Sequence, residues 1–273
     1  MIYFHWIAGC LLGLVWFSRL ADAALGVPSI ADISRPECDR APAQSCQSSR
    51  VSIIVPARNE EHDIEQTLRR LLVLDYGNYE VIAVDDRSSD RTGEIIARLA
   101  RSPEAHGILK AVRIEALPSG WVGKTHAMWT AAQQATGDWL LFTDADVQFK
   151  PDSVRRAIAY AEADRADHVV LFPRMIMKQP GEKMMTAFFQ TLFVFGPRPW
   201  KVADPRTRDH MGVGAFNLIR RRVYEAVGAY QALRMEILDD MKLGKVVKNA
   251  GYAQRNAFGA VISIGQRCDG NGK

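Results

Sequence analysis

Residues 139–146 read WLLFTDAD, and residues 80–86 read EVIAVDD. Both are apolar runs of the length of a β-strand, and both end in a pair of aspartates. Three more runs of β-branched and apolar residues lie at 51–55 (VSIIV), 108–114 (ILKAVRI) and 168–172 (HVVLF). We therefore predict strands that are buried on both faces, as in a parallel sheet.

Amphipathic helical segments separate these runs. Residues 62–74 place four aliphatic side chains on one helical face, and further helices are predicted from an N-cap at Asp90, over residues 124–135 and from a first-turn proline at Pro151. The predicted fold class is α/β, with a Rossmann-like, mostly parallel sheet flanked by helices. Ligands bind such sheets outside the carboxyl ends of the strands, so we expect both aspartate pairs to converge on one rim.

The N-terminal residues 2–20 (IYFHWIAGCLLGLVWFSRL) are apolar, and no acidic or basic side chain other than His5 precedes Arg19. A helix of that length rises about 28 Å, close to the hydrocarbon thickness of a bilayer. A cleaved signal peptide is the alternative, but it would carry a basic residue ahead of the apolar run. We expect residues 1–21 to be a transmembrane signal anchor in the cell inner membrane, with the rest of the chain cytoplasmic.

Composition assigns the remaining segments. Residues 22–50 carry proline, glycine and small polar residues without an apolar period, which is typical of a linker. Residues 51–264 are expected to form the folded domain, and residues 265–273 an irregular C-terminal end. The formal charge is only +4, and the four cysteines show no metal-finger spacing. These features disfavour nucleic-acid binding and a zinc- or disulfide-built scaffold.

Asp144 and Asp146 follow an apolar strand at a spacing of two, so both carboxylates can face one cation. Hard divalent ions such as Mg²⁺ or Mn²⁺ prefer oxygen ligands and commonly bridge to phosphates. The plainer interpretation of either aspartate pair is an acidic turn, because aspartate side chains hydrogen-bond to nearby backbone in turns. Since Asp85 and Asp86 form a second pair at another strand end, we favour a site for a metal and phosphate.

Two further segments are expected near this rim. Residues 56–61 (PARNEE) are either a polar loop that caps the next helix or a set of nucleotide contacts; the absence of GxGxxG disfavours a dinucleotide. Residues 120–125 (GWVGKT) resemble a phosphate loop, but Pro118 stands where a Walker A motif needs glycine. Lys124 is therefore either a surface lysine at a helix start or a cation placed near a diphosphate.

Two segments of the C-terminal half each allow two interpretations. Residues 236–243 (EILDDMKL) put Asp239 and Asp240 in the first turn of a helix, where the helix dipole favours acids. The functional alternative makes Asp240 a general base for a hydroxyl. Residues 184–195 (MMTAFFQTLFVF) are too short to span a bilayer and are either a buried or an interfacial helix. No HxxxH, HxH or GxSxG pattern occurs, which disfavours zinc and serine hydrolases.

Three motifs occur in order along the chain: VSIIVPARNEE, VIAVDDRSSDRT and GKTHAMWTAAQQATGDWLLFTDADV. Together they resemble the family 2 glycosyltransferases of GT-A fold, and in particular the membrane-bound branch that includes ceramide glucosyltransferase-like and hopanoid-pathway enzymes. The likeness runs over about residues 51–261, so the domain at 51–264 is expected to be a GT-A glycosyltransferase domain. The resemblance implies a nucleotide-sugar donor, a divalent metal, and inversion at the anomeric carbon by one direct displacement.

The resemblance also implies roles for individual residues. The donor-binding positions match Pro56, Ala57 and Glu60 in the nucleotide loop, Asp85 and Asp86 at base and ribose, Lys124 near the donor, and Asp144 at the diphosphate. Asp144 and Asp146 match the DxD that holds Mg²⁺ or Mn²⁺, with Asp146 the better ligand. Asp240 matches the catalytic base and Asp239 the acid before it. Residues 212–217 (GVGAFN) resemble the acceptor-side segment.

One departure from the family concerns the C-terminus. Many membrane-bound relatives follow the base with a (Q/R)xxRW motif and transmembrane helices, whereas here no tryptophan follows Trp200, and residues 266–268 (QRC) are at best a remnant. We therefore expect a truncated C-terminal end. The predicted function is transfer of a sugar from a nucleotide-sugar donor, expected to be a UDP-sugar, to a lipid hydroxyl at the cytoplasmic membrane face. The alternatives are an inactive nucleotide-sugar-binding protein and a nucleotidyltransferase.

Overall fold

The computed structural model describes residues 2–39, 49–176 and 179–264 of the chain. The C-terminal end predicted over residues 265–273 lies outside this described part. Within it, a nine-stranded sheet has the order β1-β9-β7-β8-β5-β2-β3-β4, and β6 pairs with β9. The strands are β1 (Ala31–Asp32), β2 (Val51–Ala57), β3 (Tyr79–Asp86), β4 (Leu109–Ile114), β5 (Trp139–Phe142), β6 (Val147–Phe149), β7 (His168–Ile176), β8 (Asn217–Arg220) and β9 (Gln254–Ile264).

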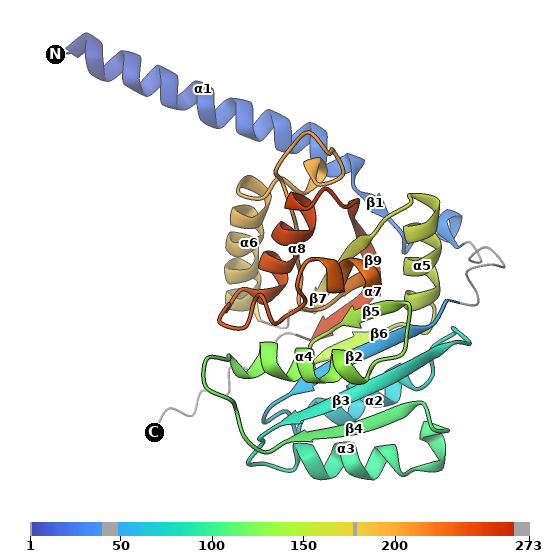
Figure 1. The fold of residues 1–273 in the computed structure, drawn as a ribbon. Coiled ribbons are helices and arrows are strands. Elements are labelled where there is room, and N and C mark those ends of the chain that lie inside the picture. Colours follow the sequence, from blue (N-terminus) through green and yellow to red (C-terminus); the bar gives the residue numbers. More distant parts are fainter. Residues whose placement is uncertain (1, 40–48, 177–178, 265–273) are drawn as a thin grey trace.

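Helices cover both faces of this sheet, which confirms the predicted α/β class (Figure 1). They are α1 (Ile2–Gly26), α2 (Ile64–Leu71), α3 (Thr92–Ala100), α4 (Gly123–Gln134), α5 (Ser153–Ala163), α6 (Pro180–Phe195), α7 (Arg221–Ala226) and α8 (Asp239–Asn249), with 3-10 turns η1 (Val27–Ser29), η2 (Pro36–Cys38), η3 (Pro103–Ala105) and η4 (Pro199–Lys201). Several boundaries differ from the prediction. Helix α2 spans Ile64–Leu71 rather than 62–74, and β7 continues past 172 to Ile176. Helix α5 begins two residues after Pro151, and the N-cap of α3 is Arg91 rather than Asp90.

The core is divided between the two faces of the sheet because successive strand residues point in opposite directions. Along β2, Ile53 and Val55 pack into the cluster that α2, α3 and α5 cover. Ile54 packs into the other cluster, with side chains of α4, α7 and α8. Double-sided burial of this kind explains why the strand runs are continuously apolar rather than alternating.

The sheet is mostly parallel but contains antiparallel pairs that the sequence pattern did not reveal. Strands β5, β2, β3 and β4 are mutually parallel, so their carboxyl ends meet at one edge. Strand β8 lies antiparallel between β5 and β7, and β6 is antiparallel to β9. Both strands are only three or four residues long, too short to stand out from the loops around them.

Part of the segment expected to be a linker is folded onto the domain. Within residues 22–50, β1 pairs in parallel with β9, and Ile33 is buried in the core. Arg156 of α5 donates hydrogen bonds to the backbone carbonyls of Ile33 and Arg35 at 3.0 and 2.9 Å. A single buried side chain produces no apolar period, and the sequence pattern therefore gave no sign of this strand.

Helix α1 projects away from the domain (Figure 1). Residues Tyr3–Ser29 form the one helical stretch in the described part that is long and apolar enough to cross a membrane, with mean hydropathy 1.5 and 6% of the window buried. Its base is attached to the domain: Lys201 pairs with Asp22 at 2.9 Å, and the Trp200 ring occupies the space next to Gly26 where a Cβ would be. The helix satisfies the length and composition expected of a membrane anchor.

Candidate functional site

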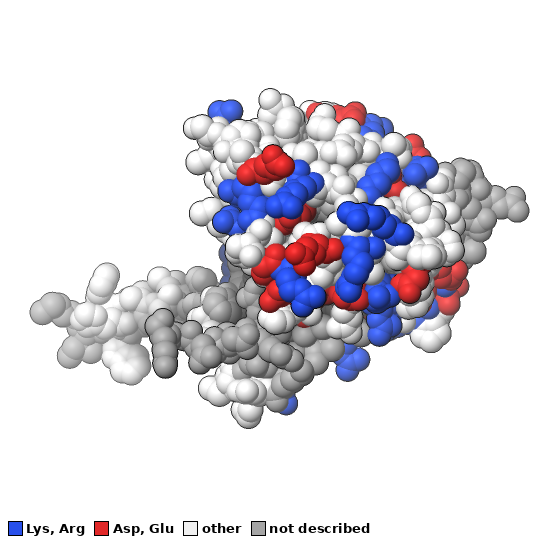
Figure 2. Space-filling view, turned by 90° about the horizontal axis from the view of Figure 1, so that it is seen from below, with Lys and Arg blue, Asp and Glu red and all other residues white. Residues whose placement is uncertain are grey.

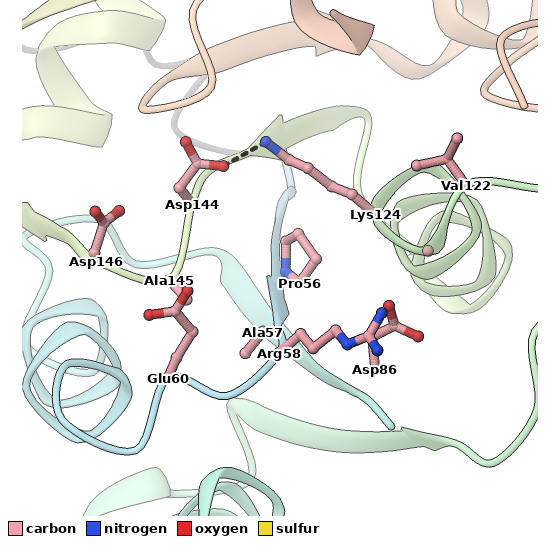
Figure 3. Close-up of a pocket in the computed structure, with 11 residues that line it drawn as sticks. Pro56, Ala57, Arg58, Glu60, Asp86, Val122, Lys124, Asp144, Ala145 and Asp146 are labelled. Atoms are coloured by element: carbon pink, nitrogen blue, oxygen red, sulfur yellow. Dashed lines mark hydrogen bonds and ion pairs between the residues drawn. The ribbon is translucent and has the colours of Figure 1, made fainter. Parts of the chain in front are cut away.

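A cavity of about 440 Å³ opens at the carboxyl ends of β2, β3 and β5 (Figure 3). This is the rim on which the sequence placed the two aspartate pairs. The lining residues come from three strand ends and the start of α4: Pro56, Ala57, Arg58, Glu60, Asp86, Val122, Gly123, Lys124, Asp144, Ala145 and Asp146. Pro56 is tolerated within β2 because β5 pairs with this strand only as far as Ile54.

The loops after β2 and β3 hold each other in place. Asn59 has a positive φ of 57°, a conformation that asparagine tolerates better than most residues. Its side-chain oxygen accepts the backbone N–H of Ser89 at 2.9 Å, and its own N–H donates to Ser88 Oγ at 3.1 Å. The backbone N–H of Glu60 donates to Thr92 Oγ1 at 2.8 Å. These contacts fix the loop that brings Arg58 and Glu60 to the lining of the cavity.

The first aspartate pair divides into two different environments. Asp85 is buried and does not line the cavity; its carboxylate accepts the Ser88 N–H at 3.0 Å and packs against Gly93. Asp86 lines the cavity and forms a two-point ion pair with the Arg87 guanidinium at 2.8 and 3.1 Å. The turn interpretation therefore describes Asp85, while Asp86 is presented to the cavity.

Lys124 joins the second aspartate pair to the acids of α8. Its ammonium donates to Asp144 Oδ1 at 2.6 Å (Figure 3) and lies 4.0 Å from Asp239 Oδ1. Burial alone would lower the pKa of Lys124, but the Asp144 and Asp239 carboxylates outweigh this effect and raise it. Lys124 is therefore a fixed cation between the two acidic groups.

The cavity holds more negative charge than this lysine neutralises. Burial, together with the charge of Asp144, raises the pKa of Asp146. Burial, followed by the charge of Asp146, also raises the pKa of Glu60. Both carboxyl groups line the cavity, so the rim favours a cation.

The acids at the start of α8 lie on the other side of Lys124. Asp239 is only 5% exposed, and burial raises its pKa to about 6. The hydroxyl of Tyr230 lies 3.5 Å from Asp239 Oδ2. Asp240 is half-buried, and one of its carboxylate oxygens accepts the N–H of Met241 at 2.7 Å, which sets its orientation.

Two glycines of residues 212–217 allow this segment to close around the acids. A Cβ on Gly214 would lie 2.4 Å from the Asp144 carboxylate, and one on Gly212 would lie 1.9 Å from the backbone carbonyl of Asp240. Any side chain at either position would collide with these groups. The segment thus fits between the end of β5 and the start of α8, beside the acids of both.

Most of the residues predicted for the site lie together in the structure, but the sequence pattern did not single out two others, Arg58 and Tyr230. Arg58 lines the cavity from the end of β2, although only its neighbours were singled out in PARNEE. Tyr230 lines the space next to Asp239 and Asp240, beside Asn217 of the predicted segment 212–217. Their positions depend on the placement of β8 and of the turn before α8, neither of which has a periodic signal.

Comparison with known proteins gives the family of this chain. The family model for glycosyl transferase family 2 matches residues 52–228, which includes the strand ends, Lys124 and the second aspartate pair. The chain belongs to glycosyl transferase family 2. The sequence motifs that resemble this family lie in the segments that form the cavity.

Two similar proteins are described as acting on lipid-type acceptors. The chain is 25% identical over 197 residues to a 4,4'-diaponeurosporenoate glycosyltransferase of Staphylococcus haemolyticus, covering 71% of this chain and 50% of the relative. It is 35% identical over 114 residues to an undecaprenyl-phosphate 4-deoxy-4-formamido-L-arabinose transferase of Pectobacterium carotovorum, covering 41% and 33%. The present chain therefore spans about half of the length of the first relative and a third of the second.

Solved structures support the GT-A-like fold. The mannosyltransferase PcManGT of Pyrobaculum calidifontis, in complex with GDP-Man and Mn²⁺, matches with a TM-score of 0.66 at 23% identity, covering 94% of this chain and 67% of that one. S. aureus TarS 1-349 in complex with UDP matches with a TM-score of 0.55 at 18% identity, covering 79% and 60%. At these identities the likeness establishes the fold alone.

Proposed function

We propose that this protein transfers a sugar, with inversion, from a nucleoside-diphosphate sugar, in first place a UDP-sugar, to the hydroxyl of a lipid at a membrane. The observation that carries the proposal is the position of Lys124, which lies between Asp144 of the cavity and Asp239 of α8. One cation thereby links a cavity at the nucleotide-binding edge of an α/β sheet to a second acidic group. The donor diphosphate would then lie on the Asp144 side of Lys124, and the acceptor on the Asp239 side.

The donor occupies the cavity in this proposal. Pro56, Ala57 and Glu60 hold the nucleotide from the end of β2, and Asp86 contacts base and ribose from the end of β3. Lys124 supplies positive charge to the diphosphate. Asp85, which is buried, contributes by holding the loop that carries Ser88 rather than by touching the donor.

A divalent cation, Mg²⁺ or Mn²⁺, fits the donor set of Asp144 and Asp146. In the described residues no group of three or more His, Cys, Asp or Glu side chains is arranged to hold a metal, so a cation here would draw further ligands from the substrate. Lys124 already occupies one oxygen of Asp144, which makes Asp146 the stronger ligand. When bound, the cation would stabilise the negative charge of the leaving diphosphate.

Asp240 is the proposed base. It accepts the proton of the acceptor hydroxyl as that oxygen forms its bond to the anomeric carbon and the bond to the diphosphate breaks on the opposite face. The hydrogen bond from the Met241 N–H orients the carboxylate for this step. Asp239, with its raised pKa, is proposed as the neighbour that sets the charge around Asp240 and Lys124.

Two features support a lipid acceptor and a membrane location. The apolar helix α1 leaves the domain next to α6, and α6 exposes Met184, Met185 and Leu192. Exposed apolar side chains on a helix that contacts a candidate membrane span favour the interfacial interpretation of residues 184–195 over the buried one. Because Arg19 follows the apolar run, we propose that the domain lies on the cytoplasmic side of the inner membrane.

The distribution of charged side chains on one face of the protein can be compared with that of nucleic-acid binders. Figure 2 shows basic and acidic side chains interleaved on the face seen from below, without a continuous basic stripe. Nucleic-acid binders present a clustered basic surface. The face drawn in Figure 2 does not present such a cluster.

Calorimetric titration of UDP and GDP into the detergent-solubilised full chain, with and without Mn²⁺, tests the proposal. We expect Mn²⁺-dependent binding of UDP that Asp146→Ala weakens by about 100-fold, because a cation ligand and its charge are lost. Asp164→Ala is the matched control, since this exposed acid follows α5, pairs with Arg255 near the start of β9 and does not line the cavity. Failure of the wild type to bind either nucleotide would contradict the proposal, and release of pyrophosphate during turnover would identify a nucleotidyltransferase.

A further inference from the structure

Three large apolar side chains are exposed directly before the acids of α8. Met235, Ile237 and Leu238 are 62%, 84% and 70% exposed. A turn of this kind is usually polar, and clustered apolar exposure marks a surface that something covers. We name these three residues the apolar lip.

The apolar lip is held firmly on its scaffold and is not a loose tip. The carbonyl of Arg234 accepts the Val122 N–H at 2.8 Å and the Thr125 hydroxyl at 2.9 Å, which ties the turn to the start of α4. The N–H of Lys242 donates to the Leu238 carbonyl at 3.0 Å, which ties the turn to α8.

The side chain between the lip residues is engaged as well. Glu236 forms an ion pair with Lys242 at 2.7 Å, and its backbone N–H donates to the carbonyl of the buried Leu233 at 3.0 Å. The polar residue of the turn is therefore satisfied within the protein, while its apolar neighbours are presented to the outside.

The apolar lip lies directly before the acids of α8 and is tied to the start of α4. Leu238 is adjacent in sequence to Asp239, so their Cα atoms are about 3.8 Å apart. The helix to which Arg234 is tied, α4, also carries Lys124. The exposed side chains of Ile237 and Leu238 therefore lie within three residues of Asp240 along the chain. A purely polar acceptor would gain nothing from these side chains, whereas an alkyl or polyprenyl chain would cover them.

We propose that the apolar lip binds the hydrocarbon chain of an amphiphilic acceptor and so holds the polar end of that molecule at Asp240. This inference rests on the proposed function and specifies the acceptor class: a long-chain lipid whose reacting group is a terminal hydroxyl or hydroxyl-bearing headgroup. The lip thereby selects acceptors by their apolar part, separately from the membrane contact made by α1 and α6.

The test compares the binding of two fluorescent alcohols, one long-chain and one short-chain, to the detergent-solubilised full chain in the presence of UDP and Mn²⁺. In the double variant Ile237→Ser with Leu238→Ser, we expect the Kd of the long-chain alcohol to rise about ten-fold, because two aliphatic contacts are removed. The Kd of the short-chain alcohol is expected to stay unchanged. Serine at position 238 also suits the N-cap of α8, so folding should be preserved.

A control variant separates the lip from general apolar exposure. Val73→Ser removes an exposed aliphatic side chain, 61%, just after α2 and away from the cavity and from α6. It should leave the long-chain Kd unchanged. An unchanged Kd in the lip variant, or an equal rise in Val73→Ser, would overturn the inference. If UDP failed to bind the wild type, the donor proposal would fail, while binding of the alcohols would still test the lip.

Discussion

Two buried acids in this protein have opposite electrostatic environments. Glu80, near the start of β3, is 1% exposed and accepts hydrogen bonds from Ser52 Oγ, from the N–H and hydroxyl of Thr136, and from Lys110 Nζ, at 2.6–2.7 Å. Burial would raise its pKa, but these donors outweigh burial and lower the pKa to about 2. The charged form of Glu80 is therefore fully accommodated by the fold.

Asp239, at the start of α8, is almost as buried but has far fewer partners. Lys124 lies 4.0 Å away and the Tyr230 hydroxyl 3.5 Å away, and burial raises the pKa of Asp239 to about 6. An acid that only supports the fold is satisfied within the protein, whereas an acid at a ligand site is left to be completed by what binds. Substitutions of each acid, or of its neighbour, test whether this difference between the two acids reflects function.

The largest effect is expected from substituting Asp240, the acid next to Asp239. Asp240→Asn should lower the rate of sugar transfer by about 10²–10⁴-fold, because the acceptor hydroxyl loses its base, while UDP affinity stays the same. Single-turnover transfer and calorimetric UDP binding measure the two quantities. Glu236→Gln is the control, since this nearby acid pairs with Lys242. Transfer at the wild-type rate in Asp240→Asn would remove Asp240 from the mechanism.

A large effect on stability is expected at the satisfied acid. Glu80→Ala should lower the free energy of unfolding by about 2–4 kcal/mol, because buried donors on Ser52 and Thr136 lose their acceptor. Nucleotide binding should not change in this variant. Denaturant unfolding measures the loss, and Glu80→Gln, which keeps an acceptor, should be destabilised less. Equal loss in both variants would mean that the charge, rather than the hydrogen bonds, matters.

The sign of the pH dependence follows from the lowered pKa of Glu80. The ordinary pKa is 4.5 and the folded value is about 2, so the unfolded chain binds the proton more tightly. The stability that Glu80 contributes is complete above pH 4.5 and is lost as the pH falls toward 2. The unfolding curves of wild type and Glu80→Ala should therefore converge in acid.

At Asp239 the sign is reversed. Its pKa rises from 3.8 to about 6 on folding, so the folded protein binds the proton more tightly and loses stability as the pH rises through this interval. Asp239→Asn removes that loss. The unfolding free energy of the variant, relative to wild type, should increase by about 2 kcal/mol between pH 4 and pH 7 and then stay constant. Urea unfolding in EDTA without nucleotide measures it; a flat difference across this range would show that Asp239 has an ordinary pKa.

How much of this the sequence could predict depends on which part of the structure fixes each residue. Asp86, Asp144 and Asp146 were placed on one rim because the ends of adjacent parallel strands meet, and that rule needs only the apolar runs. Glu80 could not be recognised as a satisfied acid, because Ser52 and Thr136 reach it through the register between β2, β3 and β5.

The same limit applies to features that a few residues create. Strand β8 separates β5 from β7, yet its four residues lie inside GVGAFNLIR without a turn signal on both sides. Residues 31–35 are held by the pairing of β1 with β9, by the buried Ile33 and by the hydrogen bonds that Arg156 donates to two backbone carbonyls. Periodicity detects elements that bury a whole face, and it does not detect single residues that contact distant parts of the chain.

The smallest expected effect comes from an acid that has two charged partners but little burial. Glu65 accepts hydrogen bonds from Arg69 at 3.0 and 3.1 Å and from Arg98 at 2.5 Å, and the Arg69 hydrogen bond is the main reason that its pKa is lowered. Its side chain is 36% exposed, so water replaces either partner at little cost. Glu65→Gln should change the unfolding free energy by less than about 1 kcal/mol, and less still at high salt. A loss as large as that of Glu80→Ala would mean that the number of partners, and not burial, distinguishes the acids of this fold.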